Sequence, residues 1–246
     1  MIKKPLTEPE LRRFRLQMNM QGINLEGQEK LKNARIAMIG LGGTGTNVLQ
    51  YLSSLGVGYF AIIDNALVDE LSIQRQSLYG GADLGKLKTI ISRQRLLELY
   101  PLTEYEIINL RLDNSNIDRV LMPFDLIIDA TNNSDSNYLI NDACIRLNKP
   151  WVFTAVSANW VMFSVFNYND GPSLRCFDKP IVYSTDVVIS LSYGMAGLFA
   201  STEALKIITG QQGILQSQML SFNCLDYTSH LSEIVKNVSN FEFIAN

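Results

Sequence analysis

A glycine-rich loop is the first feature of the chain whose residue types and spacing could do chemistry. Gly40-Leu41-Gly42-Gly43-Thr44-Gly45 follows a run of apolar residues and precedes a helical pattern. Glycines permit a tight turn and a close approach of the backbone to phosphate, and the free N–H groups that begin a helix bind anions. Asp64 ends the next apolar run, where an acid commonly binds ribose hydroxyls. We therefore expect a nucleotide site built from Gly40, Gly42, Gly43, Gly45 and Asp64; the alternative is a tight turn that binds nothing.

Basic residues downstream of this loop bear on which nucleotide binds. The glycines alone leave both a nicotinamide dinucleotide and ATP open. Arg75, within Gln74-Arg75-Gln76, and Lys88 suit a triphosphate, whose charge must be neutralised as pyrophosphate leaves. By spacing alone, a solvated helix start at Gly85–Lys88 is an equally good interpretation.

Strand-like and helix-like segments alternate through the first 150 residues. The predicted strands are Arg35–Ile39, Tyr59–Ile63, Tyr105–Leu110, Asp125–Asp129, Trp151–Ala155, Val161–Tyr168 and Leu215–Phe222, with a strand or coil near Leu231–Lys236. The predicted helices run from Thr7 towards Met20 and over Leu25–Leu31, Thr46–Leu55, Leu84–Tyr100, Ser136–Leu147 and Val187–Thr209. This alternation predicts an α/β fold, a Rossmann-like, doubly wound, mainly parallel sheet with antiparallel C-terminal strands.

Composition limits the kind of protein this can be. The 246 residues, of which 47% are hydrophobic, suit one large domain. We expect an N-terminal helical segment (1–34), a nucleotide-binding core (35–150) and an antiparallel extension with a long helix (151–246). The net charge of −3 comes from well-mixed charges, and the apolar runs are strand-length, so we expect neither nucleic acid nor a membrane as a partner. No signal-peptide core follows Lys3-Lys4-Pro5, which predicts a cytoplasmic protein.

An ordered set of motifs resembles the ThiF/MoeB/HesA family, the bacterial relatives of ubiquitin-activating enzymes. The motifs are Gly27–Arg35, the glycine loop, Gln74-Arg75-Gln76, Gly85-Lys86-Leu87-Lys88, Asn141–Cys144 and Glu203–Lys206, and the resemblance covers about residues 11–225. Members of this family bind ATP and Mg²⁺ and attach AMP to a carboxylate, usually the C-terminus of a small ubiquitin-like protein. The resemblance implies that Gly42, Gly43 and Gly45 hold phosphate and that Asp64 holds the ribose. It also implies that Arg75 and Lys88 stabilise the phosphates in the transition state, with support from Gln76.

Two catalytic positions of that family are changed in this chain. When Arg13 and Gln17 are aligned to the family's Arg-x-x-Arg-Gln, Leu16 stands where an arginine finger enters the partner subunit's site. Asn132 stands where the family has its magnesium-binding aspartate. Asn132 keeps an oxygen ligand but lacks the negative charge that Mg²⁺ prefers. We therefore expect Arg75, Lys88 and Asn132 as the catalytic residues, with ATP and a weakened Mg²⁺ site.

The zinc site of many family members is also changed. Ser173-Leu174-Arg175-Cys176 replaces one of the family's two CxxC pairs, and no cysteine follows Ser229. The other cysteines, Cys144 and Cys224, form no CxxC pair either. We expect no zinc, and we assign no residues to a metal site other than the weakened Mg²⁺ site.

Two tryptophans and the single histidine have structural and functional interpretations. Trp151 and Trp160 flank a predicted strand turn, and packing in the core or at a dimer interface is the simpler interpretation. The alternative is a groove for an acceptor's tail, because relatives of this family thread such a tail across that face. His230 is expected at the surface or in a structural contact.

Three functions are consistent with the sequence. The first is ATP-dependent adenylyl transfer to the carboxylate of a ubiquitin-like protein, a peptide or a small acid. The second is a nucleotide-binding pseudoenzyme, or the non-catalytic half of a heterodimeric activating enzyme. The third, an NAD(P)-dependent oxidoreductase, is disfavoured by Gln74-Arg75-Gln76 and Lys88. For the first two we expect a homodimer or a heterodimer.

Overall fold

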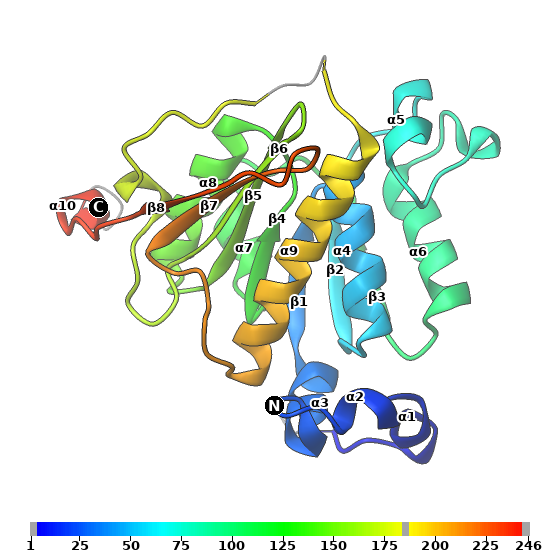
Figure 1. Cartoon of the computed structure of the whole chain (residues 1–246). Helices are drawn as coiled ribbons and strands as arrows, with labels where there is room; N and C mark the ends of the chain where they lie inside the picture. Colours follow the sequence, from blue (N-terminus) through cyan, green and yellow to red (C-terminus); the bar gives the residue numbers. More distant parts are fainter. Residues whose placement is uncertain (1–3, 184–186, 243–246) are drawn as a thin grey trace.

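One sheet organises the computed structural model, which describes residues 4–183 and 187–242 (Figure 1). Its strands, in spatial order, are β3 (Glu104–Ile108), β2 (Tyr59–Ile63), β1 (Arg35–Ile39), β4 (Leu126–Asp129), β5 (Trp151–Ser157), β6 (Trp160–Phe166), β7 (Gln218–Asn223) and β8 (Ser229–Glu233). Neighbours from β3 to β5 pair in parallel, and β6, β7 and β8 add antiparallel pairs. The predicted mainly parallel sheet with antiparallel C-terminal strands is confirmed.

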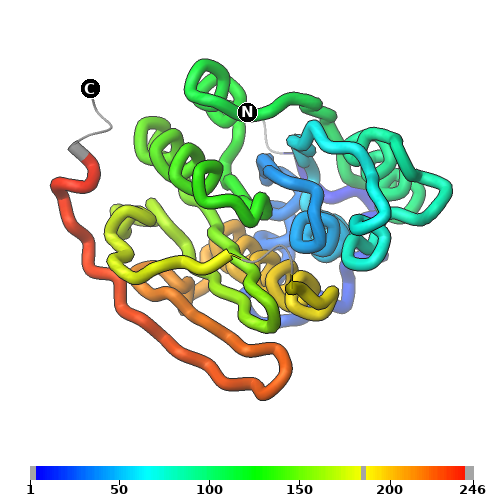
Figure 2. Tube along the Cα trace, turned by 90° about the horizontal axis from the view of Figure 1, so that it is seen from above, coloured from blue at the N-terminus to red at the C-terminus, as the bar shows by residue number. Residues whose placement is uncertain are grey.

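Helices cover both faces of the sheet (Figures 1 and 2). On one face lie α4 (Gly43–Ser54), α6 (Lys88–Leu99) and α9 (Ser190–Thr209), and on the other lie α7 (Ile117–Leu121) and α8 (Ser134–Arg146). Alternate residues of β1 serve the two cores: Ile36 and Met38 pack towards α4, whereas Ala37 and Ile39 pack towards α8. Because both faces are covered, the central strands are continuous apolar runs.

The N-terminal segment lies beneath the amino-terminal ends of the central strands (Figure 1). It forms α1 (Glu8–Arg13), α2 (Arg15–Met18) and α3 (Asn24–Asn33). The predicted capping box is present, since Thr7 and Glu10 exchange hydrogen bonds at the start of α1. The single helix predicted from Thr7 towards Met20 is interrupted at buried Phe14, whose backbone leaves the helical conformation.

Two predicted helix starts near the glycine loop are wrong. α4 begins at Gly43 instead of Thr46, with Gly42 as its N-cap, so the loop's last glycines are helical. α6 begins at Lys88 instead of Leu84, because Gly81–Asp83 forms a 3₁₀ turn and Gly85 has a φ of +75°. The short helices α5 (Glu70–Arg75) and α10 (Ser239–Glu242) were not predicted.

Two further expectations concern the whole chain. None of the helices within residues 4–183 and 187–242 has the length and apolar character that crossing a bilayer requires. The division into segments 1–34, 35–150 and 151–246 stays a prediction.

Candidate functional site

The glycine loop connects β1 to α4 through two close backbone contacts. Gly40 has a φ of +90°, and a Cβ there would lie 2.8 Å from the Ala130 carbonyl oxygen. A Cβ on Gly45 would lie 2.0 Å from the Gly40 carbonyl oxygen. These contacts require glycine and place the first turn of α4 directly over the end of β1. Free N–H groups of that turn therefore border the space above the sheet.

Asp64, at the carboxyl end of β2, is already tied to this loop. Its Oδ2 accepts a hydrogen bond of 2.6 Å from the N–H of Leu41, and its Oδ1 accepts one of 2.7 Å from the N–H of Ala66. The carboxylate thus fixes the loop against β2. Carboxylate oxygens can accept further hydrogen bonds, so Asp64 can also bind hydroxyl groups.

Lys88 is a buried cation at the first residue of α6. The residue is 8% exposed, and among the residues that the structure describes its ammonium group makes no hydrogen bond or ion pair. Burial lowers the pKa of Lys88, whereas the charges of Asp64 and Asp69 raise it and that of Arg75 lowers it. The charge of an ammonium group in this position is stabilised by any anion that enters the cavity.

Arg75 and Gln76 end α5 beside the glycine loop. One nitrogen of Arg75 donates to the Leu71 carbonyl at 2.7 Å, and its guanidinium carbon lies 6.0 Å from the ring centre of Tyr193. The Oε1 atom of Gln76 is buried without a hydrogen-bond partner in the described chain. A buried polar atom without a partner is costly to the fold and indicates a missing ligand or water.

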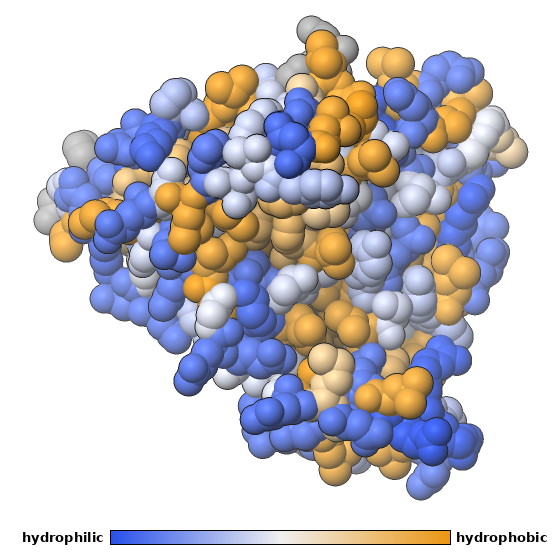
Figure 3. All heavy atoms as spheres, in the orientation of Figure 1, coloured by the Kyte–Doolittle hydropathy of each residue, from blue (hydrophilic) through white to orange (hydrophobic). Residues whose placement is uncertain are grey.

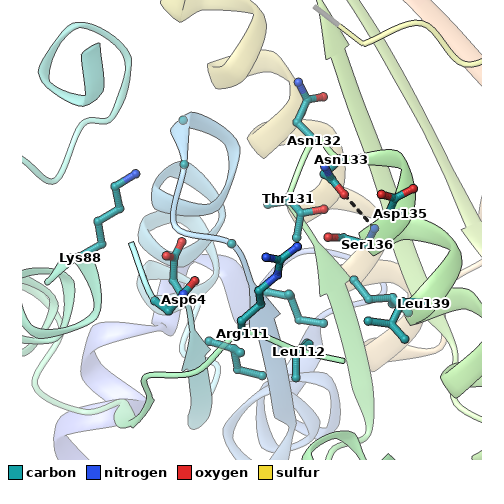
Figure 4. Close-up of a pocket in the computed structure, with 18 of the residues that line it drawn as sticks. Asp64, Lys88, Arg111, Leu112, Thr131, Asn132, Asn133, Asp135, Ser136 and Leu139 are labelled. Carbon is teal, nitrogen blue, oxygen red and sulfur yellow. Dashed lines mark hydrogen bonds between the residues drawn. The ribbon is translucent and has the colours of Figure 1, made fainter. Parts of the chain in front are cut away.

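These residues surround one cavity of about 540 Å³ above the carboxyl ends of the central strands (Figure 4). Of the residues predicted to form the site, the cavity brings together Gly40, Gly42, Gly43, Asp64, Arg75, Gln76, Lys88 and Asn132. Gly45 does not line it and acts in packing. The cavity also includes residues that the sequence analysis missed, chiefly Leu110, Arg111, Leu112 and Leu139.

Asn132 lies in the loop between β4 and α8 with its amide group engaged. Nδ2 donates to the Val156 carbonyl at 3.1 Å, and Oδ1 accepts from the Val156 N–H at 2.7 Å. The next two polar side chains differ: Asn133 caps α8 by accepting a hydrogen bond of 2.9 Å from Ser136, and Asp135 is exposed in the first turn. Figure 4 shows Asp135 beside Asn133 and Ser136, consistent with the predicted helix N-terminal acid.

A fully buried carboxyl group, Asp129, supports the same loop from below. It accepts hydrogen bonds from the N–H and hydroxyl of Thr131 and from Nδ2 of Asn137. Tyr183 in turn donates to Oδ1 of Asn137. Burial raises the pKa of Asp129 to about 6, and the hydrogen bonds from Thr131 and Asn137 offset part of that rise. This chain of hydrogen bonds joins the segment before α9 to the edge of the cavity.

Leu16, which is predicted to align with the arginine finger of the ThiF/MoeB/HesA family, is 77% exposed on α2. Figure 1 shows α1 and α2 at the end of the molecule opposite α5 and the start of α4. Arg12, Arg13 and Arg15 lie in the same segment, so none of these side chains is near the cavity of its own chain.

A polar cluster surrounds Cys176, in the region predicted to correspond to the CxxC pairs of the ThiF/MoeB/HesA family. The Cys176 sulfur accepts from the N–H of Asn237 at 3.4 Å and from Nδ2 of Asn240 at 3.8 Å, and lies 3.6 Å from the Ser173 hydroxyl. Burial would raise the pKa of Cys176, but these hydrogen bonds outweigh it and the pKa is lowered. Within the described part of the chain, no three His, Cys, Asp or Glu side chains gather into a metal-binding group.

The two tryptophans have different environments. Trp151 is fully buried, as the packing interpretation predicts. Trp160 stacks on His230 with ring centres 5.7 Å apart, and both line a second, mostly apolar cavity of about 370 Å³. Pro180 and Val182, from the segment before α9, lie across the same cavity.

Comparison with known proteins identifies relatives of this chain in sequence and in fold. The sequence model described as the ThiF family matches residues 14–240. A probable molybdopterin-synthase adenylyltransferase of Porphyra purpurea is 35% identical over 92% of the chain, which spans 61% of that relative's length. A sulfur carrier protein adenylyltransferase of Thermus thermophilus is 34% identical, with 89% of this chain and 86% of the relative covered. The crystal structure of E. coli MccB with MccA-N7isoASN shares the fold, with a TM-score of 0.84 at 19% identity, covering 96% of this chain and 74% of that one. The resemblance found in the motifs is confirmed, and the chain belongs to the ThiF family.

Proposed function

We propose that this chain binds ATP in the cavity above the glycine loop and transfers AMP to a carboxylate. The observation that carries the proposal is Lys88, a buried ammonium with no hydrogen-bonded or ionic partner in the described chain, placed beside Arg75 and Gln76. A fold gains nothing from an unpaired buried cation, whereas a triphosphate needs one. A Cβ on Gly42 would meet no atom within 4 Å, so the cavity is open where the loop backbone faces it.

The chemistry assigns a role to each group. A carboxylate oxygen of the acceptor attacks the α-phosphorus, a new P–O bond forms, and the bond to the β-phosphate breaks with release of pyrophosphate. N–H groups at the start of α4 hold phosphate oxygens. Arg75 and Lys88 neutralise the charge that grows on the departing pyrophosphate. Asp64 accepts hydrogen bonds from the ribose hydroxyls while it holds the N–H of Leu41.

Mg²⁺ would accompany ATP and withdraw charge from its phosphates. The cavity is lined by side chains with oxygen atoms, among them Asp64, Thr131 and Asp135, which suit this hard cation. Mg²⁺ needs only one or two protein ligands besides phosphate oxygens and water. Asn132 supplies no negative charge, and both polar atoms of its amide are bonded to Val156. We therefore propose that the protein holds Mg²⁺ weakly, and that the phosphates contribute most of its ligands.

The proposed acceptor is the C-terminal carboxylate of a small ubiquitin-like protein or of a peptide. The names of the Porphyra and Thermus relatives refer to molybdopterin synthase and to a sulfur carrier protein, and MccB has been crystallised with MccA-N7isoASN. In this chain the second cavity, with Trp160, His230, Pro180 and Val182 on its walls, offers an apolar surface for such a tail.

Exchange of labelled pyrophosphate into ATP tests this function. The purified chain is mixed with ATP, Mg²⁺ and a ubiquitin-like protein or short peptide with a free C-terminus. Exchange should require the acceptor, and the same acceptor with an amidated C-terminus should give none. Binding of NAD without binding of ATP would instead support the oxidoreductase that the sequence disfavours.

A second candidate function is a nucleotide-binding pseudoenzyme or the non-catalytic half of a heterodimer. Two observations favour it: the position of the family's finger is the exposed Leu16, and the amide of Asn132 is engaged by Val156. An arginine finger contributes about 10³–10⁵ in rate in phosphoryl-transfer enzymes. Tight ATP binding without exchange for any acceptor would support this candidate. Exchange that appears only after a second chain is added would support the heterodimer.

A dimer and a cytoplasmic location are also proposals. Figure 3 shows apolar side chains along the face formed by α9 and its neighbouring strands. Leu191 and Leu198, seven residues apart on α9, are 64% and 42% exposed, and Tyr227 in the β7–β8 turn is 75% exposed. Contiguous apolar surface of this kind suits a protein partner. Light scattering of the purified chain measures the oligomeric state, and fractionation of the source cells locates the protein.

A further inference from the structure

The nucleotide cavity has two chemically different ends. Arg75 and Lys88 line one end. Leu112 and Leu139 line the other, where they pack against the apolar cluster between the sheet and α7 and α8. Figure 4 shows Lys88 on one side of Asp64 and the two leucines on the other. A nucleotide has the same polarity, with charged phosphates at one end, an aromatic base at the other and the ribose between them.

Arg111 is a cation at the apolar end. It follows β3, and Figure 4 shows its side chain rising into the cavity between Asp64 and Thr131. Within residues 4–183 and 187–242 its guanidinium makes no hydrogen bond or ion pair. It acts electrostatically on Asp113, whose pKa is lowered mainly by hydrogen bonds from Ser115. Arg111 is exposed to solvent, and nothing in the described fold fixes its guanidinium, so the side chain is free to lie against a ligand beside the leucines.

We infer that Arg111 packs its guanidinium on the base of the bound nucleotide and so recognises the base instead of the phosphates. A guanidinium is planar and weakly hydrated, and it stacks on aromatic rings, whereas the leucines supply an apolar wall for the other surface of the ring. This inference rests on the proposed function, because it takes the ribose to be held by Asp64. With the ribose there, the phosphates extend towards Lys88 and away from Arg111.

The opposing possibility is that Arg111 is a third phosphate ligand. Both roles predict weaker ATP binding when the arginine is removed, so ATP alone does not separate them. Adenosine carries the base without phosphate, and inorganic tripolyphosphate carries the phosphates without a base. Removing a residue that stacks on the base should weaken the binding of adenosine but not of tripolyphosphate. Removing a phosphate ligand should weaken the binding of tripolyphosphate but not of adenosine.

The experiment measures the affinity of ATP, adenosine and tripolyphosphate by calorimetry for the wild type and four variants. Arg111→Ala should weaken ATP and adenosine by the same factor, about 3- to 30-fold, and leave tripolyphosphate unchanged. Lys88→Met should do the reverse, weakening ATP and tripolyphosphate and sparing adenosine. Arg119→Ala removes an exposed arginine of α7 that does not line the cavity, and it should bind all three ligands as the wild type does.

Two results would show that Arg111 acts through its charge and would overturn its assignment to the base. One is a loss of tripolyphosphate affinity in Arg111→Ala equal to the loss for ATP. The other is full rescue by Arg111→Lys, because an ammonium restores the charge but not the planar surface. Wild-type protein that binds neither ATP nor adenosine would overturn the proposed function itself. If instead the wild type binds ATP and Arg111→Ala binds ATP and adenosine equally well, only the assignment of Arg111 is overturned.

Discussion

The side chain of Asn132 bonds to both polar groups of the Val156 backbone, accepting from its N–H at 2.7 Å and donating to its carbonyl at 3.1 Å. Asn132 has a φ of +51°, a left-handed conformation that asparagine adopts more readily than most residues. The pair of bonds fastens the β4–α8 loop to the end of β5, 24 residues away in the chain. At this position the amide holds two elements of the fold together, a task that a carboxylate, with no donor, can only half perform.

Asn132→Asp should therefore destabilise the fold but strengthen the binding of Mg²⁺. The aspartate keeps the bond from the Val156 N–H but faces the Val156 carbonyl with a second acceptor. We expect the free energy of unfolding to fall by about 1–3 kcal/mol. The added negative charge should lower the Mg²⁺ concentration that half-saturates pyrophosphate exchange. Urea denaturation and a Mg²⁺ titration measure the two effects separately.

Asn133→Asp is the matched control for that variant. It adds the same charge one residue later, and an aspartate there can still accept the capping hydrogen bond from Ser136. Its stability should stay within about 0.5 kcal/mol of the wild type. If Asn133→Asp lowers the Mg²⁺ requirement as much as Asn132→Asp, charge anywhere near the cavity suffices and position 132 has no special role.

The sheet and the phosphate loop could be predicted from the sequence because their signals are local. Each central strand is an apolar run, and the glycines of the loop stand between a strand pattern and a helix pattern. α5 was missed because six residues are too few to show a helical period. Its start does carry a signal, since Asp69 caps it by accepting from the N–H of Ser72.

The contacts that define the site depend on residues far apart in the sequence. Asn132 was expected to be a weakened metal ligand, and only the fold brings Val156 to its amide. Arg111 was missed because the sequence does not show in which direction the side chain of a lone arginine after a strand points. Its position just beyond the carboxyl end of β3, at the edge of the sheet where nucleotides bind, is the signal that could have drawn attention to it.

Lys88→Met should make the ligand-free protein more stable and the protein less able to bind triphosphate. Methionine fills a similar volume without a buried charge, so we expect the free energy of unfolding to rise by about 1 kcal/mol. A charged hydrogen bond to phosphate is worth about 1.5–3 kcal/mol, so ATP affinity should fall about 10- to 100-fold and AMP affinity much less. Thermal unfolding and calorimetry measure the two changes.

The control is Lys86→Met, which removes an exposed lysine two residues away. It should leave ATP affinity and stability close to the wild-type values. An equal loss of ATP and AMP affinity in Lys88→Met would show that Lys88 does not contact the phosphates beyond the α-phosphate. In the wild type, the lowered pKa of Lys88 also means that ATP affinity should decline as the pH rises through that pKa and the lysine loses its charge.

The polar cluster around Cys176 predicts that a zinc site can be built there. Ser173 and Cys176 have CxxC spacing, and so do Asn237 and Asn240. The Cys176 sulfur lies within 3.8 Å of the Ser173 hydroxyl, of the Asn240 amide nitrogen and of the backbone N–H of Asn237, whose own side chain accepts from Ser239. The triple variant Ser173→Cys, Asn237→Cys, Asn240→Cys should bind one Zn²⁺ per chain through four thiolates, with an increase in thermal stability that a chelator reverses. Metal analysis after dialysis measures the stoichiometry.

Two comparisons make that result specific. Wild-type protein should retain no zinc through the same dialysis, because serine and asparagine are poor zinc ligands. Ser173→Cys alone should bind zinc no more tightly than the wild type. Zinc bound by the triple variant without any gain in stability would mean that the four thiolates do not converge on one metal ion.

The buried carboxyl of Asp129 should make stability depend on pH in the direction opposite to that of a salt-bridged acid. Its pKa is raised from 3.8 to about 6 in the folded chain, so between these values the native state binds a proton that the unfolded state has released. The stability contributed by Asp129 is fully present below about pH 4 and is lost as the pH rises through about 6, a change of about 3 kcal/mol. Asp129→Asn should remove this dependence, because a neutral amide can keep the bond from Thr131 and, with the Asn137 amide reversed, the bond to Asn137. Urea denaturation of both proteins at pH 4 and pH 7 gives the difference.

The control Asp135→Asn removes an exposed carboxylate from the start of α8 and separates the loss of a buried charge from the loss of any charge. If Asp129→Asn and the wild type change in parallel between the two pH values, the carboxyl is ionised throughout and the burial argument fails.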